Sequence, residues 1–267
     1  MDHLRDVVMW ILLEVAVLLV AIALFMGSLE VGYRLGLRRQ VKSDEPDRTH
    51  ANALHGAVLG LLALLLGFTF AMAVSRYENR KTLIVDQANA IGTAELRSRL
   101  LGTPYAEKAA PLFRDYVDAW LQFRFAGDDI AAVKAAEDRA FAIENQLWNM
   151  VREVTAADPH SLPASLFTSA VNDVIDMHEK RNRSVKDRVP DPVFWLLFAV
   201  SALALGLVAY SCGLNGRRRQ VANVVFAFVI ALVMVVILDI DRPRRGLIQA
   251  SQESMVRLQQ SLEPMPK

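Results

Sequence analysis

The sequence has little of what catalytic or disulfide-stabilised proteins require. Only one of its 267 residues is a cysteine, Cys212, which excludes an intramolecular disulfide and a cysteine-ligated zinc site. The five histidines have no paired spacing, and the chain contains no GxSxG, GxGxxG, GxxxxGKS/T or HExxH pattern. We therefore predict no enzyme activity, no cofactor and no metal site.

The sequence also lacks an excess of charge of either sign. Its 30 Lys and Arg residues nearly cancel its 29 Asp and Glu residues, which leaves a net charge of +1. Such a balance gives no electrostatic reason to expect nucleic acid as a partner. Apolar residues make up 53% of the chain, which is too many for a disordered protein.

Long apolar runs are what the sequence has instead. A helix that crosses a bilayer needs about 20 mostly apolar residues, and four stretches meet this requirement, at about 10–31, 53–74, 193–212 and 221–238. None of them alternates between polar and apolar residues as a membrane strand would. We predict an all-α integral membrane protein that crosses the cell inner membrane several times.

The positions of these runs divide the chain into four parts. We expect a transmembrane hairpin over 1–74, a helical soluble insertion over 75–191, a second hairpin over 192–240, and a C-terminal amphipathic helix and tail over 241–267. The first helix of the insertion should continue directly out of the second span. Further helices are expected at about 103–127 with Thr103 as N-cap, from Asp128 or Asp129 to 157, at 161–186 and at 247–262.

The membrane orientation is ambiguous from charge alone. The two short loops between paired spans hold eight Lys and Arg residues, which weakly favours an inside location for these loops. The opposite side of the membrane holds at least as many basic residues close to the spans.

One face of the helix that leaves the second span is entirely polar. Spacings of three and four residues place seven polar side chains on this face: Ser75, Asn79, Thr82, Asp86, Asn89, Thr93 and Arg97. Two interpretations stay open, a solvated or hydrogen-bonded helix face, and the lining of a water-filled vestibule continuous with a pore. A ring of subunits would bring such faces together around one axis.

Two acidic residues close the fourth span in the run LDIDRPRRG. A carboxylate at a helix C-terminus is disfavoured by the helix dipole, so Asp239 and Asp241 should have cationic partners. Arg76 and Arg80 at the end of the second span are candidates, and Arg242 follows directly in the sequence. Structural ion pairing and a role in ion coordination or gating both stay open.

Two features inside the spans complete the set of candidates. An ionised Glu14 in the first span would cost at least about 2.5 kcal/mol unless it is paired or hydrated. In the second span, Gly56 and Gly60 form a GxxxG motif, which we expect to permit close helix packing.

Three segments carry a family resemblance. The runs RYENRKTLIVDQANAIGTAELRSRLL, NDVIDMHEKRNRSVKDRVPDP and LDIDRPRRGLIQASQES resemble the bacterial bestrophin-like membrane proteins, a family named for its likeness to bestrophin anion channels. The resemblance extends over about 55–254. It implies an order of two spans, a helical insertion and two further spans, with the insertion and both termini in the cytosol.

The same resemblance implies a homo-oligomer of five subunits around a pore lined by the second span. Bestrophins narrow this pore with apolar and aromatic side chains one helical turn apart, a spacing that Leu62, Leu66 and Phe70 share. Another face of the span offers Leu59, Ala63 and Gly67 for the same role. The acidic calcium clasp of animal bestrophins has no counterpart in this sequence.

These observations predict a multimeric channel for small ions, most simply anions. The pore would follow the second span and the helix that continues it. The alternative is a non-conducting membrane scaffold or signalling protein that acts through its helical insertion.

Overall fold

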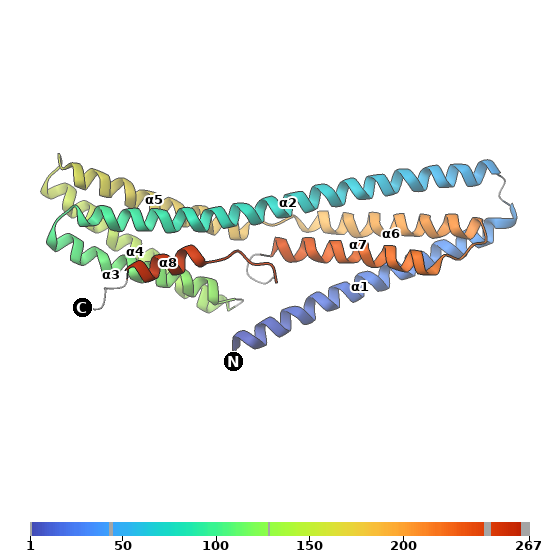
Figure 1. The fold of residues 1–267 in the computed structure, drawn as a ribbon, viewed down its shortest axis with the longest axis horizontal. Helices are drawn as coiled ribbons and strands as arrows, with labels where there is room; N and C mark the ends of the chain where they lie inside the picture. The colour runs from blue at the N-terminus through green and yellow to red at the C-terminus, as the bar shows by residue number, and fades with distance from the viewer. Residues whose placement is uncertain (1, 43–44, 128, 243–246, 263–267) are drawn as a thin grey trace. The chain divides into compact units, whose positions relative to one another are not determined.

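The computed structural model describes all residues except 1, 43–44, 128, 243–246 and 263–267 (Figure 1). The described residues form helices and the segments between them, and no strand occurs among them. Four helical stretches are long and apolar enough to cross a membrane. The predicted all-α class with four potential spans is thereby confirmed.

The helices up to α7 follow one another with short connections, and a longer segment separates α7 from α8. Their bounds are α1 (Asp2–Arg39), the 3₁₀ turn η1 (Gln40–Lys42), α2 (Glu45–Arg99), α3 (Thr103–Phe125), α4 (Ile130–Ala157), α5 (Leu162–Lys186), α6 (Asp191–Leu214), α7 (Gln220–Asp241) and α8 (Glu253–Leu262). The predicted continuation of the second span is confirmed, because α2 is one helix of 55 residues. Gly92 does not interrupt it, in keeping with the modest cost of one glycine in a helix.

Two helix starts are as predicted. The Asp129 side chain accepts hydrogen bonds from the backbone N–H groups of Ala131 and Ala132 at the start of α4. Ser161 caps α5 in the same way, by accepting from Ala164. These are the side chains that best satisfy the free N–H groups of a first helical turn. Asp128, the other predicted start of α4, lies outside the described residues.

Two other predicted helix starts are wrong. Thr103 is the first helical residue of α3, and the N-cap is Gly102, whose φ of 86° is a backbone conformation that glycine adopts readily. The last helix begins at Glu253 rather than at 247. The residues before it are engaged elsewhere, since the backbone N–H groups of Leu247 and Ile248 bind the Asp239 carboxylate.

The chain forms two compact units, which are described separately. Unit 1 comprises Met1–Ser75, Arg188–Arg242 and Gly246–Ile248, and contains α1, α6, α7 and the apolar part of α2. Unit 2 comprises Arg76–Asp187, Pro243–Arg245 and Gln249–Lys267, and contains the remainder of α2 with α3, α4, α5 and α8. Pro243, Arg244 and Arg245 lie outside the described residues.

Small residues bring α1 and α6 into close contact in unit 1. A Cβ atom on Gly32 would lie 2.1 Å from the carbonyl oxygen of Gly206, and one on Gly36 would lie 2.2 Å from another α6 carbonyl. Ser28 donates a hydrogen bond to a third carbonyl of α6. The spacing of four residues places Ser28, Gly32 and Gly36 on one face, where the two backbones approach as small residues permit in membrane bundles.

The GxxxG motif of the second span has no such role within the described chain. A Cβ atom on Gly56 or Gly60 would meet no atom within 4 Å. Within the described residues of one chain, the close approach occurs between α1 and α6 instead. Close packing of Gly56 and Gly60 against another helix stays a prediction. A GxxxG spacing permits a close contact, but it does not provide the partner helix.

Each unit has its own apolar core. In unit 1, Phe25 of α1 is fully buried with its ring centroid 6.3 Å from that of Phe198 on α6. In unit 2, a larger cluster joins the five helices. Its largest fully buried side chains are Ile91, Phe113, Tyr116, Trp120, Leu147, Phe167 and Met255.

Candidate functional site

The polar face of α2 is turned away from the core of unit 2. Arg97 is half-buried and donates a 3.0 Å hydrogen bond to the Leu166 carbonyl oxygen. The other predicted members are all exposed: Ser75, Asn79, Thr82, Asp86, Asn89 and Thr93. The opposite face of the helix packs into the core through Ile84 and Ile91. The polar face is therefore available to solvent or to another molecule.

The three residues that are predicted to narrow the pore, Leu62, Leu66 and Phe70, differ in their surroundings. Leu62 is only 3% exposed and belongs to the core of unit 1, whereas Leu66 is half-buried and Phe70 is 42% exposed. Ala63 and Gly67 on the alternative face are exposed but too small to narrow a pore. Phe70 is thus the bulky side chain of the predicted set that is freest of packing within its own chain.

Asp239 and Asp241 bind backbone amides at the end of α7. Asp239 accepts from the N–H groups of Leu247 at 2.6 Å and Ile248 at 2.9 Å. Both carboxylate oxygens of Asp241 accept from the Val189 N–H, at 3.1 and 2.9 Å. Both carboxylates are buried, where charge-assisted hydrogen bonds of this kind are strongest. Sequence reasoning missed these partners, because they lie in segments that reach α7 only in the folded chain.

Further ionisable groups gather at the same end of α7. Glu14 of α1 lies close enough to Asp239 and to Arg242 to interact with both electrostatically. Glu14 thus has partners within its own unit, as its position in a span requires. The pairing of Asp239 and Asp241 with Arg76 and Arg80 stays a prediction.

A buried polar network crosses the core of unit 2. The Tyr116 hydroxyl donates to Glu144 Oε1 at 2.6 Å, and His178 Nδ1 lies 2.5 Å from the same oxygen. The three side chains come from α3, α4 and α5 and are buried. Burial, followed by the proximity of Glu144, raises the pKa of Tyr116 well above its usual value. Glu144 therefore links three helices through one oxygen atom.

Arg181 extends this network towards α2 and α8. Its guanidinium donates to the side-chain oxygens of Gln87 and Gln252, the latter at 2.8 Å, and lies 4.7 Å from the centre of the Trp120 ring. Burial lowers the pKa of Arg181 to about 10. The guanidinium satisfies groups on separate segments at once, which gives this network a structural role in positioning the helices.

Sequence spacing does not reveal this arrangement. Tyr116 and Trp120 of α3 are buried in the core, whereas Phe125 at the end of the same helix is exposed. His178 binds Glu144, which is 34 residues away in the sequence. Among the described residues, no group of three His, Cys, Asp or Glu side chains could hold a metal ion.

Comparison with known proteins identifies the fold. The chain is similar over 93% of its length to a bacterial bestrophin homologue from Klebsiella pneumoniae solved by Zn-SAD phasing, with 14% identity, a TM-score of 0.63 and 96% of that chain covered. A point mutant of a membrane protein gives a TM-score of 0.67 at 12% identity, with 93% of this chain and 97% of that chain covered. The search of curated proteins finds no match. Likenesses at this identity establish the fold.

The family is established by the sequence itself. Residues 19–255 match the model of the bestrophin-like domain, which is most of the chain. The match includes all four apolar stretches in whole or in large part, and all of α3, α4 and α5. It agrees with the resemblance carried by the segments after the second span. This chain therefore belongs to the bestrophin-like family of membrane proteins.

Proposed function

We propose that the protein is a multimeric ion channel of the cell inner membrane that conducts small anions and has no catalytic activity. The observation that carries this proposal is the construction of α2. A single unbroken helix begins in the apolar span and continues as a helix with an exposed polar face. Membership of the bestrophin-like family supports the same function. In the proposed orientation, the insertion and both termini lie in the cytosol.

The proposed pore needs several subunits. Four spans from a single chain would hardly enclose a water-filled channel, so α2 helices from several copies must surround one axis. Five copies are proposed from the bestrophin resemblance. Around such an axis, the polar side chains from Ser75 to Thr93 would line a hydrated vestibule, because they are exposed and do not pack against the rest of the chain.

The proposed constriction lies on the spanning part of the same helix. Phe70 is exposed and Leu66 half-buried, so both can reach the axis, and an apolar ring restricts ion flow by dewetting. Leu62, which is buried in unit 1, would support this ring from behind rather than line it. Asp239, Asp241 and Arg242, with Arg76 and Arg80, remain candidates for an ion-pair cluster that influences gating.

Replacement of the constricting side chains tests the pore assignment. Phe70→Ala and Leu66→Ala should each raise the single-channel conductance in a planar bilayer, because a smaller side chain widens the narrowest part of the pore. Phe68→Ala is the matched control. Phe68 is also exposed and lies on the same helix, but two residues away it faces a different direction. Unchanged conductance in both Phe70→Ala and Leu66→Ala would count against a pore that is narrowed by these side chains.

A second function is favoured by one observation in unit 2. Phe141 and Trp148 of α4 are exposed and seven residues apart, so they lie on one face of the helix. Exposed aromatic residues are typical of protein interfaces, and a scaffold or signalling protein would use such a face to bind a partner. Stoichiometry separates the two functions, since a scaffold needs no closed ring.

A further inference from the structure

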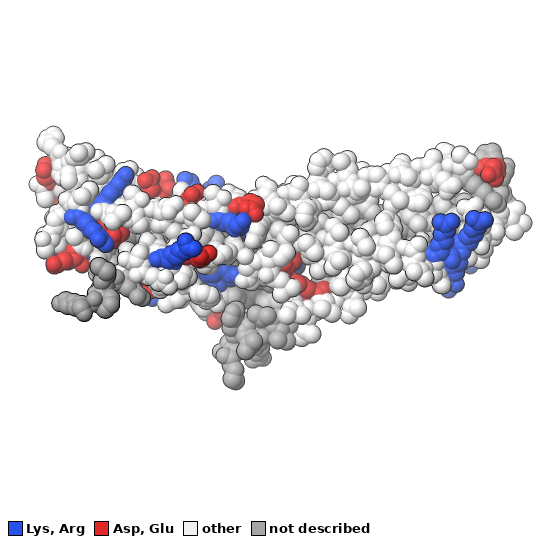
Figure 2. Space-filling view, in the orientation of Figure 1, with Lys and Arg blue, Asp and Glu red and all other residues white. Residues whose placement is uncertain are grey.

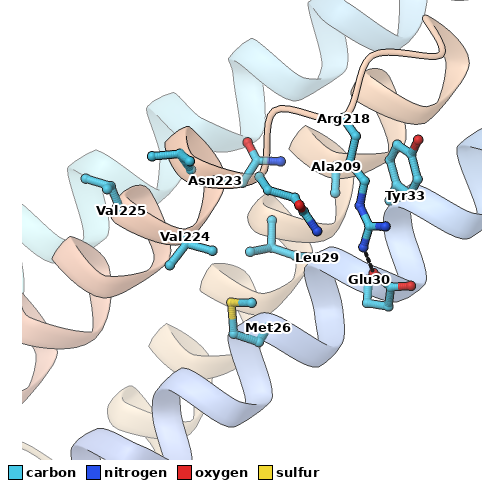
Figure 3. A pocket seen from close by; sticks show the side chains of 11 residues that line it. Met26, Leu29, Glu30, Tyr33, Ala209, Arg218, Asn223, Val224 and Val225 are labelled. Carbon is cyan, nitrogen blue, oxygen red and sulfur yellow. Dashed lines mark hydrogen bonds and ion pairs between the residues drawn. The ribbon is translucent and has the colours of Figure 1, made fainter.

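Unit 1 contains an apolar pocket between α1 and α7, beside the loop that joins α6 to α7. Its volume is about 410 Å³, and Figure 3 shows the side chains around it. Apolar side chains from two predicted spans form its walls, among them Met26, Leu29, Val221, Val224 and Val225. Because these walls are apolar, they suit a hydrocarbon chain.

One end of the pocket is polar and built around Arg218. The guanidinium of Arg218 lies 3.0 Å from Glu30 Oε2 and 5.2 Å from the centre of the Tyr33 ring (Figure 3). Arg34 shares the same carboxylate, at 2.6 Å from Glu30 Oε1. The Gln220 side-chain oxygen also accepts from Arg218, from Nε at 3.1 Å and from Nη2 at 3.0 Å. The ion pair, the ring and this amide together hold Arg218 above the apolar walls.

Positive charge exceeds negative charge around this end. Arg217 and Arg219 flank Arg218 in the exposed loop, and basic side chains gather at this end of unit 1 (Figure 2). The helix α7 begins at Gln220 without a side-chain cap from its N-cap residue, Arg219. The free N–H groups of its first turn therefore add to the attraction for an anion.

We propose that this pocket binds an anionic phospholipid. The phosphate would lie at Arg218, with Arg217, Arg219 and the start of α7 around it, and one acyl chain would extend between α1 and α7. A small anion alone would leave the apolar walls empty, and a neutral apolar molecule would leave the arginines unused. A molecule with both an anionic group and a hydrocarbon chain matches the pocket. The proposal does not depend on whether the protein conducts ions.

Native mass spectrometry of the full-length protein in detergent tests this proposal with two lipids that differ in charge, phosphatidylglycerol and phosphatidylcholine. Phosphatidylglycerol should bind at least about tenfold more tightly. Both lipids carry a phosphate, but the quaternary ammonium of phosphatidylcholine cancels its negative charge and is repelled by the arginines around Arg218. Arg218→Ala should remove this preference. Arg257→Ala is the control, because Arg257 is an exposed arginine of α8 that also pairs with a glutamate.

A second pair of variants tests the apolar part. Val224→Trp should fill the pocket and lower phosphatidylglycerol retention about tenfold, whereas Val229→Trp should not, since Val229 is similarly exposed on α7 but outside the pocket lining. Equal retention of the two lipids would overturn the proposal. So would wild-type retention in both Arg218→Ala and Val224→Trp, or displacement of phosphatidylglycerol by inorganic phosphate, which would identify a site for a free anion.

Discussion

Glu144 is the single residue on which the polar network of unit 2 depends most. Glu144→Ala would leave the buried Tyr116 hydroxyl and His178 ring without their common acceptor. An unsatisfied buried group costs about 1–3 kcal/mol, so we expect a loss of about 2–4 kcal/mol, measured by thermal unfolding of the full chain in detergent. Glu153→Ala on the same helix should change stability by less than about 0.5 kcal/mol, because Glu153 is exposed. Equal effects would contradict the network's role.

Asp241 should matter through its backbone partner. Asp241→Ala would leave the buried Val189 N–H without an acceptor, at a cost of about 1–3 kcal/mol. The same unfolding measurement on Asp187→Ala provides the comparison, since Asp187 is exposed. If the two variants unfold at the same temperature, the hydrogen bonds at the end of α7 do not contribute as described.

Local residue patterns predicted some helix starts correctly but not all, since Thr103 is the first helical residue of α3 and not its N-cap. The caps at Asp129 and Ser161 follow from residue type and position, and both are confirmed. The link between Glu144 and His178 has no sequence signature, because 34 residues separate them and the contact arises only when α4 and α5 pack. The backbone partner of Asp241 has no signature for the same reason, because 52 residues separate Asp241 from Val189.

At the scale of elements, the polar face of α2 makes a prediction about conduction. Asp86 is an exposed negative charge on the proposed vestibule wall. Asp86→Asn should raise anion conductance about twofold or more in planar bilayers at low salt, where a charged lining acts most strongly on ions. Asp173→Asn on α5 is the control, as an exposed carboxylate away from this face. An equal response of both variants would argue against a vestibule along α2.

The contact between α1 and α6 makes a second element-scale prediction. Gly32→Ala would place a Cβ atom 2.1 Å from the Gly206 carbonyl oxygen, so the helices must separate. We expect a loss of about 1–3 kcal/mol in thermal stability in detergent, as for other overpacked cores. Gly27→Ala on the same helix should be nearly neutral, because its Cβ atom would meet nothing within 4 Å. A neutral Gly32→Ala would show that the close approach is not required.

The sequence predicted which helices exist, but it did not predict which helices pack against one another. The lack of proline and glycine between Ser75 and Ile91 predicted that α2 continues directly out of the second span. The glycines at 56 and 60 have the same spacing as Gly32 and Gly36, yet only the α1 pair meets another backbone. Spacing identifies a face that permits close packing, and the tertiary arrangement decides which face is used.

At the scale of the whole molecule, composition and apolar runs predicted the class of protein, and the bestrophin-like family is confirmed over residues 19–255. Orientation could not be predicted from charge, because arginines lie near both ends of the spans. Assembly could not be predicted from the residues alone either. A pore between copies has no signature within one chain except surfaces that the chain leaves uncovered, such as the polar face of α2.

Halide efflux from liposomes that contain the purified wild-type protein is the most direct test of the central claim. The channel account predicts chloride efflux well above that of protein-free liposomes, from a complex whose mass is that of a closed ring of several chains. A monomer or dimer without efflux would contradict it.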